Sequence, residues 1–387
     1  MPKTRAARLS GVATTKVGEL PGSSCLALHA QVADDALIDA GLALPQVDGV
    51  ICAYSFVEPY PMMSSVFCEY VGLQPEVSFS LQLGGATAAT MVMQAAALVE
   101  AGYCRHVLCV CADNRATGMG RDGAVAALAA FGHPEFEQPY GISIPAAYAL
   151  VAQRYLHETG ATLAQLAAIA VEHRRHAALH PQAHKRSPLT LDEVMASRVI
   201  SSPLRLLDCC LISDGGAAVI VSAPEAADEL AKPGVALLGA GQGHTHEHLV
   251  CAPSLTEFGC KQSAMRAFAQ AGVGVGDIDV AEIYDSFTIT LLVELESMGF
   301  FPRGHAGPAA AAGALGLDGS LPCNTHGGLL SFGHSGAAGG MFHVVEAVRQ
   351  LRGECNARQV RDAELGFVHG DGGVLSAHCS LVLGKVA

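Results

Sequence analysis

The sequence predicts an α/β protein made of two similar halves, and three observations lead to this prediction. Residues 35–50 (DALIDAGLALPQVDGV) match residues 266–281 (RAFAQAGVGVGDIDVA) at one constant offset, with Ala-Gly and Asp at equivalent places. Each copy reads as a helix that ends at glycine, a short loop and an apolar strand. Each copy is also followed by a glycine-rich turn, a helix and a further strand. Such alternation is typical of α/β units whose sheets are covered by helices.

The individual elements follow from the same alternation. The first repeated helix ends at Gly41 and its strand ends near Tyr54, while the second helix ends at Gly272 and its strand ends near Tyr284. The elements that complete the two halves are expected, in chain order, at residues 77–83 (strand), 86–101 (helix), 107–112 (strand), 341–351 (helix) and 365–368 (strand).

An insertion interrupts the first half at about residues 114–205. We expect it to contain helices over residues 145–159 and 163–180 and note its many His residues. A long excursion of this kind is typical of a lid over a substrate or cofactor. We place the N-terminal half at residues 1–228 and the C-terminal half at residues 229–387.

The composition argues against several classes of function. The chain has 387 residues and a formal net charge of −13, whereas nucleic-acid binding needs clustered Lys and Arg. No apolar run of about 18 residues is present, so we expect a cytoplasmic protein without a membrane segment. The 13 Cys form no C-x-x-C pair, and the loop with His244, His246 and His248 lacks a matching set of acids or Cys. We therefore expect no metal site.

Gly84 and Gly85 stand where a predicted strand turns into a predicted helix. Such a turn brings free backbone N–H groups and the positive end of the helix dipole to one point. That point suits a thiolate, an oxyanion or a phosphate, although a tight turn that merely needs small residues is an alternative.

Five segments carry a resemblance to a known family: DCCLISDGGAAVIVS from Asp208, GAGQGH from Gly239, EIYDSFT from Glu282, NTHGGLLSFGHSG from Asn324 and HGDGGVLSAH from His369. On these segments the chain resembles the thiolase superfamily, above all the sterol-carrier-type thiolases and their bacterial relatives. The resemblance implies a thiolase fold, with two similar layered halves (αβαβα) and the insertion as a loop domain in the first half.

The chain departs from this family at the nucleophile. The resemblance implies a Cys at the head of the first-half helix, which a helix N-terminus would activate, but Gly85 stands there. His334 matches the family His of the G-H motif, and His369 stands at the position of a second Cys. Cys209 and Cys210 precede a buried strand and are interpreted as packing residues. We therefore do not expect the covalent acyl-enzyme intermediate of ordinary thiolases, whereas these residues still allow acid and base catalysis by proton transfer.

A subgroup of bacterial thiolase-like lipid-transfer proteins resembles this chain in lacking the Cys and in having the Tyr of a Y-D-x-F-T segment. This resemblance makes Tyr284 the first candidate for a general acid or base, although a Tyr that only packs is an alternative. Because an ordinary Tyr has a pKa near 10, a neighbour would have to assist it, and His334, His326 or His369 could do so. Backbone N–H groups would hold an enolate oxygen, and the candidates are Gly84, Gly85, Ala86, Gly372 and Gly373.

The same resemblance implies coenzyme A as the thioester of the substrate, with no permanently bound cofactor. Arg174, Arg175, Lys185 and Arg186 are candidates for contacts with the CoA phosphates, although a solvated helix face is an alternative. Asn324 could hold a water on the thioester oxygen or merely form a turn.

Three functions remain open from the sequence. The first is retro-aldol cleavage of a β-hydroxyacyl-CoA, for which a steroid or aromatic side chain is one source. The second is an acyltransferase or thiolase acting on a β-ketoacyl-CoA, and the third is a non-catalytic subunit that binds acyl-CoA or lipid. By resemblance we also expect a homodimer and a small partner protein with an OB-fold and a zinc ribbon.

Overall fold

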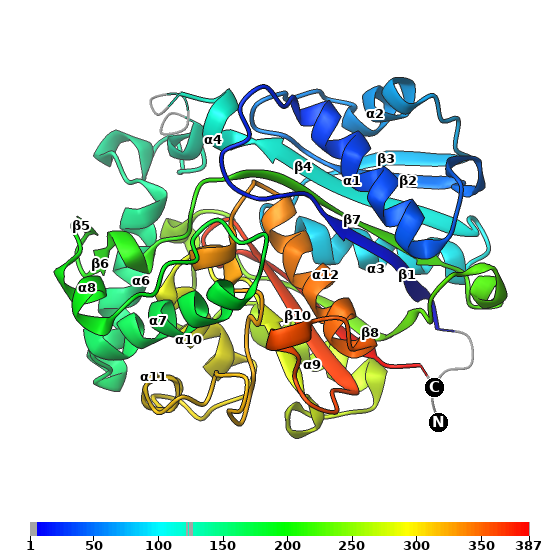
Figure 1. Cartoon of the computed structure of the whole chain (residues 1–387). Helices are drawn as coiled ribbons and strands as arrows, with labels where there is room; N and C mark the ends of the chain where they lie inside the picture. Colours follow the sequence, from blue (N-terminus) through cyan, green and yellow to red (C-terminus); the bar gives the residue numbers. More distant parts are fainter. Residues whose placement is uncertain (1–5, 121–122, 124–126, 387) are drawn as a thin grey trace.

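The two predicted halves form one continuous mixed sheet in the computed structural model, which describes residues 6–120, 123 and 127–386 (Figure 1). The sheet has nine strands in the order β3-β2-β4-β7-β1-β8-β11-β10-β9. Its strands are β1 (Arg8–Thr14), β2 (Gly49–Ala53), β3 (Val77–Leu81), β4 (His106–Asn114), β7 (Asp214–Ser222), β8 (Val235–His244), β9 (Val280–Ile283), β10 (Leu365–Gly372) and β11 (Ala377–Gly384).

The helices form layers on and between the two parts of this sheet. They are α1 (Cys25–Ala40), α2 (Met63–Val71), α3 (Thr87–Glu100), α4 (Arg115–Gly118), α6 (Ile144–Thr159), α7 (Leu163–Leu179), α8 (Leu191–Ala196), α9 (Cys260–Ala271), α10 (Thr288–Ser297), α11 (Ala306–Ala311) and α12 (Ala338–Arg352). Helices α3 and α12 pack against each other and contact strands of both parts, while α1 covers β1, β4 and β7, and α9 covers β8 and β11. The predicted αβαβα layering of the thiolase fold is thereby confirmed.

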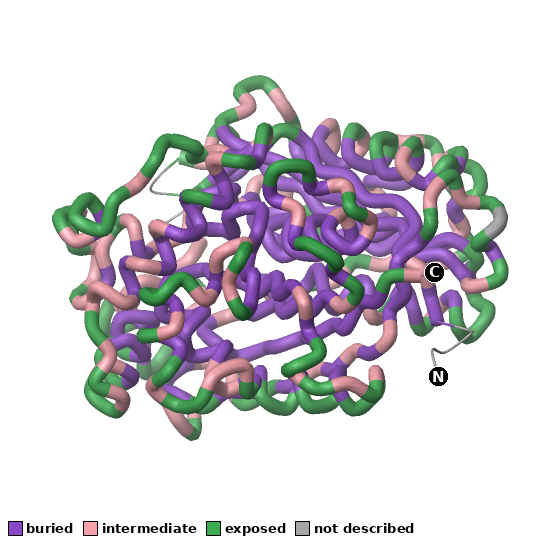
Figure 2. Tube along the Cα trace, turned by 60° about the horizontal axis from the view of Figure 1, so that its bottom comes forward, coloured by how far each residue is buried: buried purple, intermediate pink, exposed green. Residues whose placement is uncertain are grey.

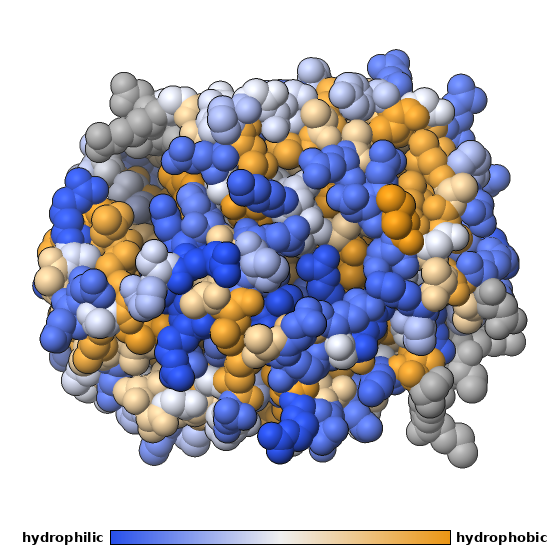
Figure 3. Space-filling view, viewed as in Figure 1, coloured by the Kyte–Doolittle hydropathy of each residue, from blue (hydrophilic) through white to orange (hydrophobic). Residues whose placement is uncertain are grey.

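The two parts of the sheet meet at a short seam. Strand β1 pairs with β8 through Arg8 with Ala236 and Leu9 with Val235. Helices α3 and α12 lie behind this seam. Their Ala, Val and Met side chains are fully buried in one large core cluster. Figure 2 shows this buried interior running through the whole molecule, and on the face in Figure 3 hydrophobic side chains are scattered among hydrophilic ones.

The internal repeat is visible in matching details of structure. Helices α1 and α9 both end at a glycine in the left-handed region, Gly41 with φ 74° and Gly272 with φ 73°, where a side chain would be strained. The Asp48 carboxylate accepts the backbone N–H of His106 at 2.9 Å, where β4 begins. Asp279 accepts the backbone N–H of Leu365 at 2.9 Å, where β10 begins. Asp48 and Asp279, which are equivalent in the repeat, therefore both hold the first residues of a strand, β4 and β10 respectively.

The insertion forms a mostly helical region beside the sheet. Helix α6 begins after Ser143, whose side chain accepts the N–H of Ala146, and α7 begins with a capping box of Thr162 and Gln165. The insertion also contains α8 and the small hairpin β5 (Val199–Ser201) with β6 (Leu204–Arg205). Within the described ranges, no helix is both long and apolar enough to cross a membrane.

Candidate active site

A cavity of about 280 Å³ lies where the glycine turn before α3, the end of β9 and the insertion meet. Its polar wall includes Tyr284, His334 and Arg115, and its floor includes Gly84 and Gly85. Much of the remaining wall is apolar and is formed by Phe56, Leu128, Phe131, Ile144, Pro145, Ile200, Leu206, Leu211, Ile212 and Phe287. The cavity therefore combines a few converging polar groups with apolar walls, as small-molecule sites usually do.

The ring of Tyr284 fills the space that a side chain at position 85 would need. A Cβ atom placed on Gly85 would lie 2.2 Å from Cζ of Tyr284 and 2.2 Å from the backbone oxygen of Asp371. Contacts below 3.0 Å are not tolerated, so this backbone admits glycine alone while Tyr284 keeps its position. At the turn where the resemblance implies a Cys thiol, a phenol that directly follows β9 therefore fills the space.

Tyr284 and His334 form a hydrogen-bonded pair inside the cavity. The Tyr284 hydroxyl lies 2.9 Å from Nε2 of His334. Burial, together with the positive charge of Arg115, lowers the pKa of His334 to about 3, and burial raises the pKa of Tyr284 well above its usual value. Both groups are therefore neutral at rest.

The thiols at the cavity wall are not suited to act as nucleophiles. Cys210 Sγ lies 3.5 Å from Nδ1 of His334, but burial raises the pKa of this thiol to about 12. Burial also raises the pKa of the neighbouring Cys209. A nucleophile needs the thiolate, so neither thiol is suited to this role in its present surroundings.

The glycine turn lies directly against the segment after β10. A Cβ on Gly372 would lie 2.0 Å from the backbone oxygen of Leu83, and one on Gly84 would lie 2.8 Å from the backbone nitrogen of Gly373. Gly84, Gly85 and Gly373 line the cavity, whereas Gly372 only packs against the turn. The expectation that the N–H of Ala86 holds the enolate oxygen is wrong. This N–H already donates to the backbone oxygen of Leu83 at 3.1 Å and is not available to a substrate.

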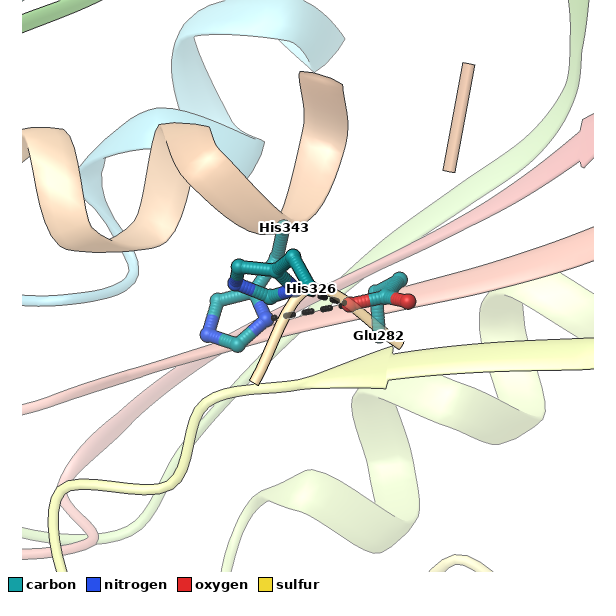
Figure 4. Close-up of side chains that lie close together, drawn as sticks. All are labelled: Glu282, His326 and His343. Atoms are coloured by element: carbon teal, nitrogen blue, oxygen red, sulfur yellow. Dashed lines mark ion pairs between the residues drawn. The ribbon is translucent and has the colours of Figure 1, made fainter. Parts of the chain in front are cut away.

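His326 belongs to a different cluster, whose residues do not line the cavity. Nδ1 of His326 lies 2.9 Å and Nδ1 of His343 lies 3.5 Å from the same Glu282 carboxylate oxygen (Figure 4). Burial opposes a charge on His326, but the Glu282 carboxylate outweighs burial and raises the pKa of this imidazole. The sequence suggested His326 as a partner of Tyr284; the structure instead pairs it with Glu282, and it does not line the cavity.

His369 is also turned away from the cavity. Its Nδ1 lies 2.8 Å from the Ser380 hydroxyl and its Nε2 lies 3.2 Å from Nδ1 of His378, and all three side chains are fully buried. The suggestion that His369 assists Tyr284 directly is therefore corrected. The sequence pattern that placed His369 at a catalytic Cys position could not show that its side chain points to the far side of β10.

Several polar residues of the cavity were not found by sequence reasoning, and Arg115 and Tyr148 are two of them. The Arg115 guanidinium stacks 4.8 Å over the Phe56 ring, and its buried Nε has no hydrogen-bond partner among the described residues. Tyr148 of α6 donates its hydroxyl to Asp371 at 2.8 Å. Neither residue belongs to a recognisable motif, and both reach the cavity through long-range packing.

The remaining sequence candidates lie elsewhere. Asn324 is buried, its side chain bonds both backbone groups of Ile283 at 2.7 Å, and it does not line the cavity. Arg174 is mostly buried and donates to Ser331 at 2.9 Å, while Arg175 pairs with Glu172 at 2.8 Å. Lys185 and Arg186 are exposed and follow α7.

Fold and cavity together define a thiolase-fold protein whose cavity holds the Tyr284 ring against Gly85, where the resemblance implies a nucleophilic Cys. A family model described as "Thiolase C-terminal domain-like" matches residues 241–385. The acetyl-CoA acetyltransferase of Methanothermobacter thermautotrophicus is 32% identical over 376 residues, which cover 95% of this chain and 97% of that protein. The chain belongs to the thiolase superfamily.

Two aldolases are also similar to this chain. The steroid side-chain-cleaving aldolase of Thermomonospora curvata is 36% identical over 366 residues, which cover 90% of each chain. The solved structure of the Ltp2-ChsH2(DUF35) aldolase matches with a TM-score of 0.86 and 34% identity over 98% of each chain. The relatives thus include proteins named for acyl transfer and proteins named for aldol cleavage.

Proposed function

We propose that this protein is an aldolase that breaks the bond between Cα and Cβ of a β-hydroxyacyl-CoA without forming a covalent intermediate. The observation that carries this proposal is the position of the Tyr284 ring, which fills the space of a nucleophile at Gly85 while its hydroxyl contacts His334 at 2.9 Å. A site with a proton-transfer pair and no thiolate supports acid and base chemistry on the substrate, and retro-aldol cleavage needs nothing more.

The proposed steps balance in protons and electrons. The β-hydroxyl of the substrate gives its proton to the Tyr284 oxygen, while Tyr284 passes its own proton to Nε2 of His334. The electron pair of the Cα–Cβ bond moves to the thioester, so that a ketone or aldehyde leaves and an enolate of the shortened acyl-CoA remains. Because burial makes the imidazolium of His334 a strong acid, it returns the proton through Tyr284 to Cα.

The enolate would be stabilised from two sides. We assign the backbone N–H groups of Gly85 and Gly373 at the cavity floor to the thioester oxygen. The buried charge of Arg115 stands on the same cavity wall and favours a negatively charged intermediate over the neutral substrate. The apolar walls favour a bulky hydrophobic acyl group, in line with relatives named for steroid substrates.

A substrate comparison tests this proposal. The purified chain, alone and with a small OB-fold and zinc-ribbon partner, is incubated with a β-hydroxyacyl-CoA that carries a ring next to Cβ and with the matching β-ketoacyl-CoA. Release of a ketone or aldehyde from the hydroxy substrate, with no consumption of free CoA, supports the aldolase. No release under either condition would contradict it.

Acyl transfer is the second candidate, favoured by the 32% identity to an acetyl-CoA acetyltransferase. Acyl transfer would be indicated by cleavage of the β-ketoacyl-CoA that depends on added CoA, together with an acyl group on the protein in intact-mass spectra. The high pKa of Cys210 argues against such an adduct.

We also propose a homodimer that pairs through β3, an edge strand of the sheet, and the OB-fold partner described above. The exposed large side chains Tyr60, Met62 and Tyr70 on and beside α2, next to this edge, support the first assignment. Lys185 and Arg186 remain the candidates for the CoA phosphates because they are exposed and form no ion pair with any described residue, whereas Arg174 is mostly buried and Arg175 pairs with Glu172.

A further inference from the structure

A second group of buried ionisable side chains lies behind the cavity wall, where α10, β10 and β11 meet. Nε2 of His369 lies 3.4 Å from Oε1 of Glu294 and 3.2 Å from Nδ1 of His378. Oε1 of Glu294 lies 3.9 Å from Nδ1 of His378, and all three side chains are fully buried. Three donor atoms of the kinds that bind metals therefore face one another in one small volume.

Hydrogen bonds around His369 fix which of its nitrogens carries the hydrogen. The Ser263 hydroxyl uses its one hydrogen to donate to the backbone oxygen of Cys260 at 2.9 Å. The hydroxyls of Ser263 and Ser380 lie 2.8 Å apart, so Ser380 must be the donor in that hydrogen bond. Ser380 must then accept at 2.8 Å from Nδ1 of His369. The neutral imidazole of His369 therefore presents a lone pair at Nε2.

The same reasoning applies to His378. Its Nε2 lies 3.0 Å from the backbone oxygen of Leu375, which can only accept, so the hydrogen is on Nε2 and the lone pair is on Nδ1. The lone pairs of His369 and His378 thus face each other at 3.2 Å. Two facing lone pairs repel unless a cation lies between them.

The carboxylates of this region also lack partners. Neither oxygen of Glu294 makes a hydrogen bond to any described residue, although both are buried. Asp371 binds Tyr148 through Oδ2, but its Oδ1 has no partner in the described chain and lies 3.9 Å from Nδ1 of His378. Unpaired buried carboxylate oxygens are costly and call for a bound ion or proton.

We propose that Glu294, His369 and His378 bind one divalent transition-metal ion, with Zn²⁺ as the best match to two imidazoles and a carboxylate. Tetrahedral zinc with bonds of about 2.0–2.1 Å places its ligand atoms about 3.4 Å apart. The observed separations of 3.2, 3.4 and 3.9 Å meet this with shifts of a few tenths of an ångström. Asp371 Oδ1 stands next to the fourth position and fills it directly or through a water.

The surroundings of the three ligands suit a metal site. Ligating imidazoles usually donate their other N–H to a carbonyl or hydroxyl, and here Leu375 and Ser380 receive these hydrogens. The ion would join α10, β10 and β11 behind the wall that carries Asp371 and Tyr148. This proposal departs from the sequence-based expectation of no metal, because the ligands come from distant segments that no short motif connects.

The cluster of Glu282, His326 and His343 provides a matched control. It has the same residue types and the same burial, but Nδ1 of His326 and Oε2 of Glu282 lie 2.9 Å apart, closer than the roughly 3.4 Å between ligand atoms of tetrahedral zinc (Figure 4). A substitution there removes a buried imidazole without touching the proposed metal ligands.

The test is metal analysis of the full-length chain purified without chelators or a metal-affinity step. We expect about one equivalent of a transition metal per chain by plasma mass spectrometry, a loss to background in Glu294→Gln and in His378→Asn, and retention in His326→Asn. A wild-type chain that contains no such metal and takes up none from added Zn²⁺ would overturn the proposal and leave a proton as the occupant. Loss in His326→Asn with retention in Glu294→Gln would also overturn it.

A second measurement covers the case in which the ligand variants do not fold. The wild-type chain is stripped with a chelator and then given Zn²⁺, Mg²⁺ or Co²⁺. We expect Tm to fall on stripping and to recover with Zn²⁺ but not with Mg²⁺, and Co²⁺ to give the visible absorption of a four-coordinate site. An unchanged Tm together with a colourless cobalt sample would contradict the proposal without any need for an activity assay.

Discussion

At position 85 a side chain and the Tyr284 ring compete for the same space. We expect Gly85→Ala to displace Tyr284 from His334, because the new Cβ would lie 2.2 Å from the ring. The free energy of unfolding should fall by about 1–3 kcal/mol, as for other overpacked sites, and aldolase activity should fall with it. Gly276→Ala is the control, since a Cβ at this exposed position contacts nothing within 4 Å. Full activity in Gly85→Ala would contradict the assigned role of Tyr284.

The low pKa of His334 has a consequence for stability. Burial lowers this pKa to about 3 in the folded protein, whereas an unfolded His titrates near 6.5. Below pH 6.5 His334 binds a proton in the unfolded chain but not in the folded chain. His334 therefore lowers the free energy of unfolding as pH falls, by roughly 1.4 kcal/mol per pH unit down to about pH 3.

Denaturant unfolding at pH 7 and pH 5 measures this effect. We expect His334→Gln to lose less stability than the wild type between these two values, while His157→Gln, an exposed position on α6, keeps the wild-type difference. Equal losses in the wild type and His334→Gln would show that His334 is not held neutral by burial.

Single residues also show how far sequence reasoning reaches. The pairing of Tyr284 with a His was anticipated, but of three candidates only His334 contacts it, at 2.9 Å. His326 and His369 stand in equally suggestive motifs, and the direction in which their side chains point depends on the packing of strands far apart in the chain. Arg115 carries no motif at all.

At the scale of elements, the segment after α7 is the proposed contact for the CoA phosphates. We expect Lys185→Ala combined with Arg186→Ala to raise KM for an acyl-CoA several-fold, because charge-assisted contacts to phosphate are lost, with kcat unchanged. The matching acyl-pantetheine thioester, which lacks the nucleotide, should show no change in KM. An equal effect on both substrates would place the nucleotide elsewhere.

The elements themselves follow from the sequence more completely than the site does. The helix ends at Gly41 and Gly272 and the strands after them were predicted from composition and spacing, and they are confirmed. The seam between β1 and β8 was not foreseen, because two residue pairs between distant strands leave no pattern in either strand.

At the scale of the whole molecule, the proposed dimer can be tested through the edge beside β3. We expect Met62→Glu to shift the chain from dimer toward monomer in sedimentation at micromolar concentration, because a charge would be buried at the interface. Ile38→Glu on α1, a position that is 76% exposed, is the control and should remain dimeric. A wild-type monomer would contradict the proposed assembly.

The central claim is that Tyr284 transfers the proton that starts the cleavage of a β-hydroxyacyl-CoA. Its most direct measurement is the single-turnover rate of carbonyl release in the wild type, in Tyr284→Phe and in Tyr155→Phe, which removes a buried hydroxyl bonded to Glu296 away from the cavity. We expect Tyr284→Phe to lose about 10²- to 10⁴-fold in rate and Tyr155→Phe to stay close to the wild type, with no free CoA consumed in either case. Wild-type release by Tyr284→Phe, or release that requires added CoA, would contradict the account.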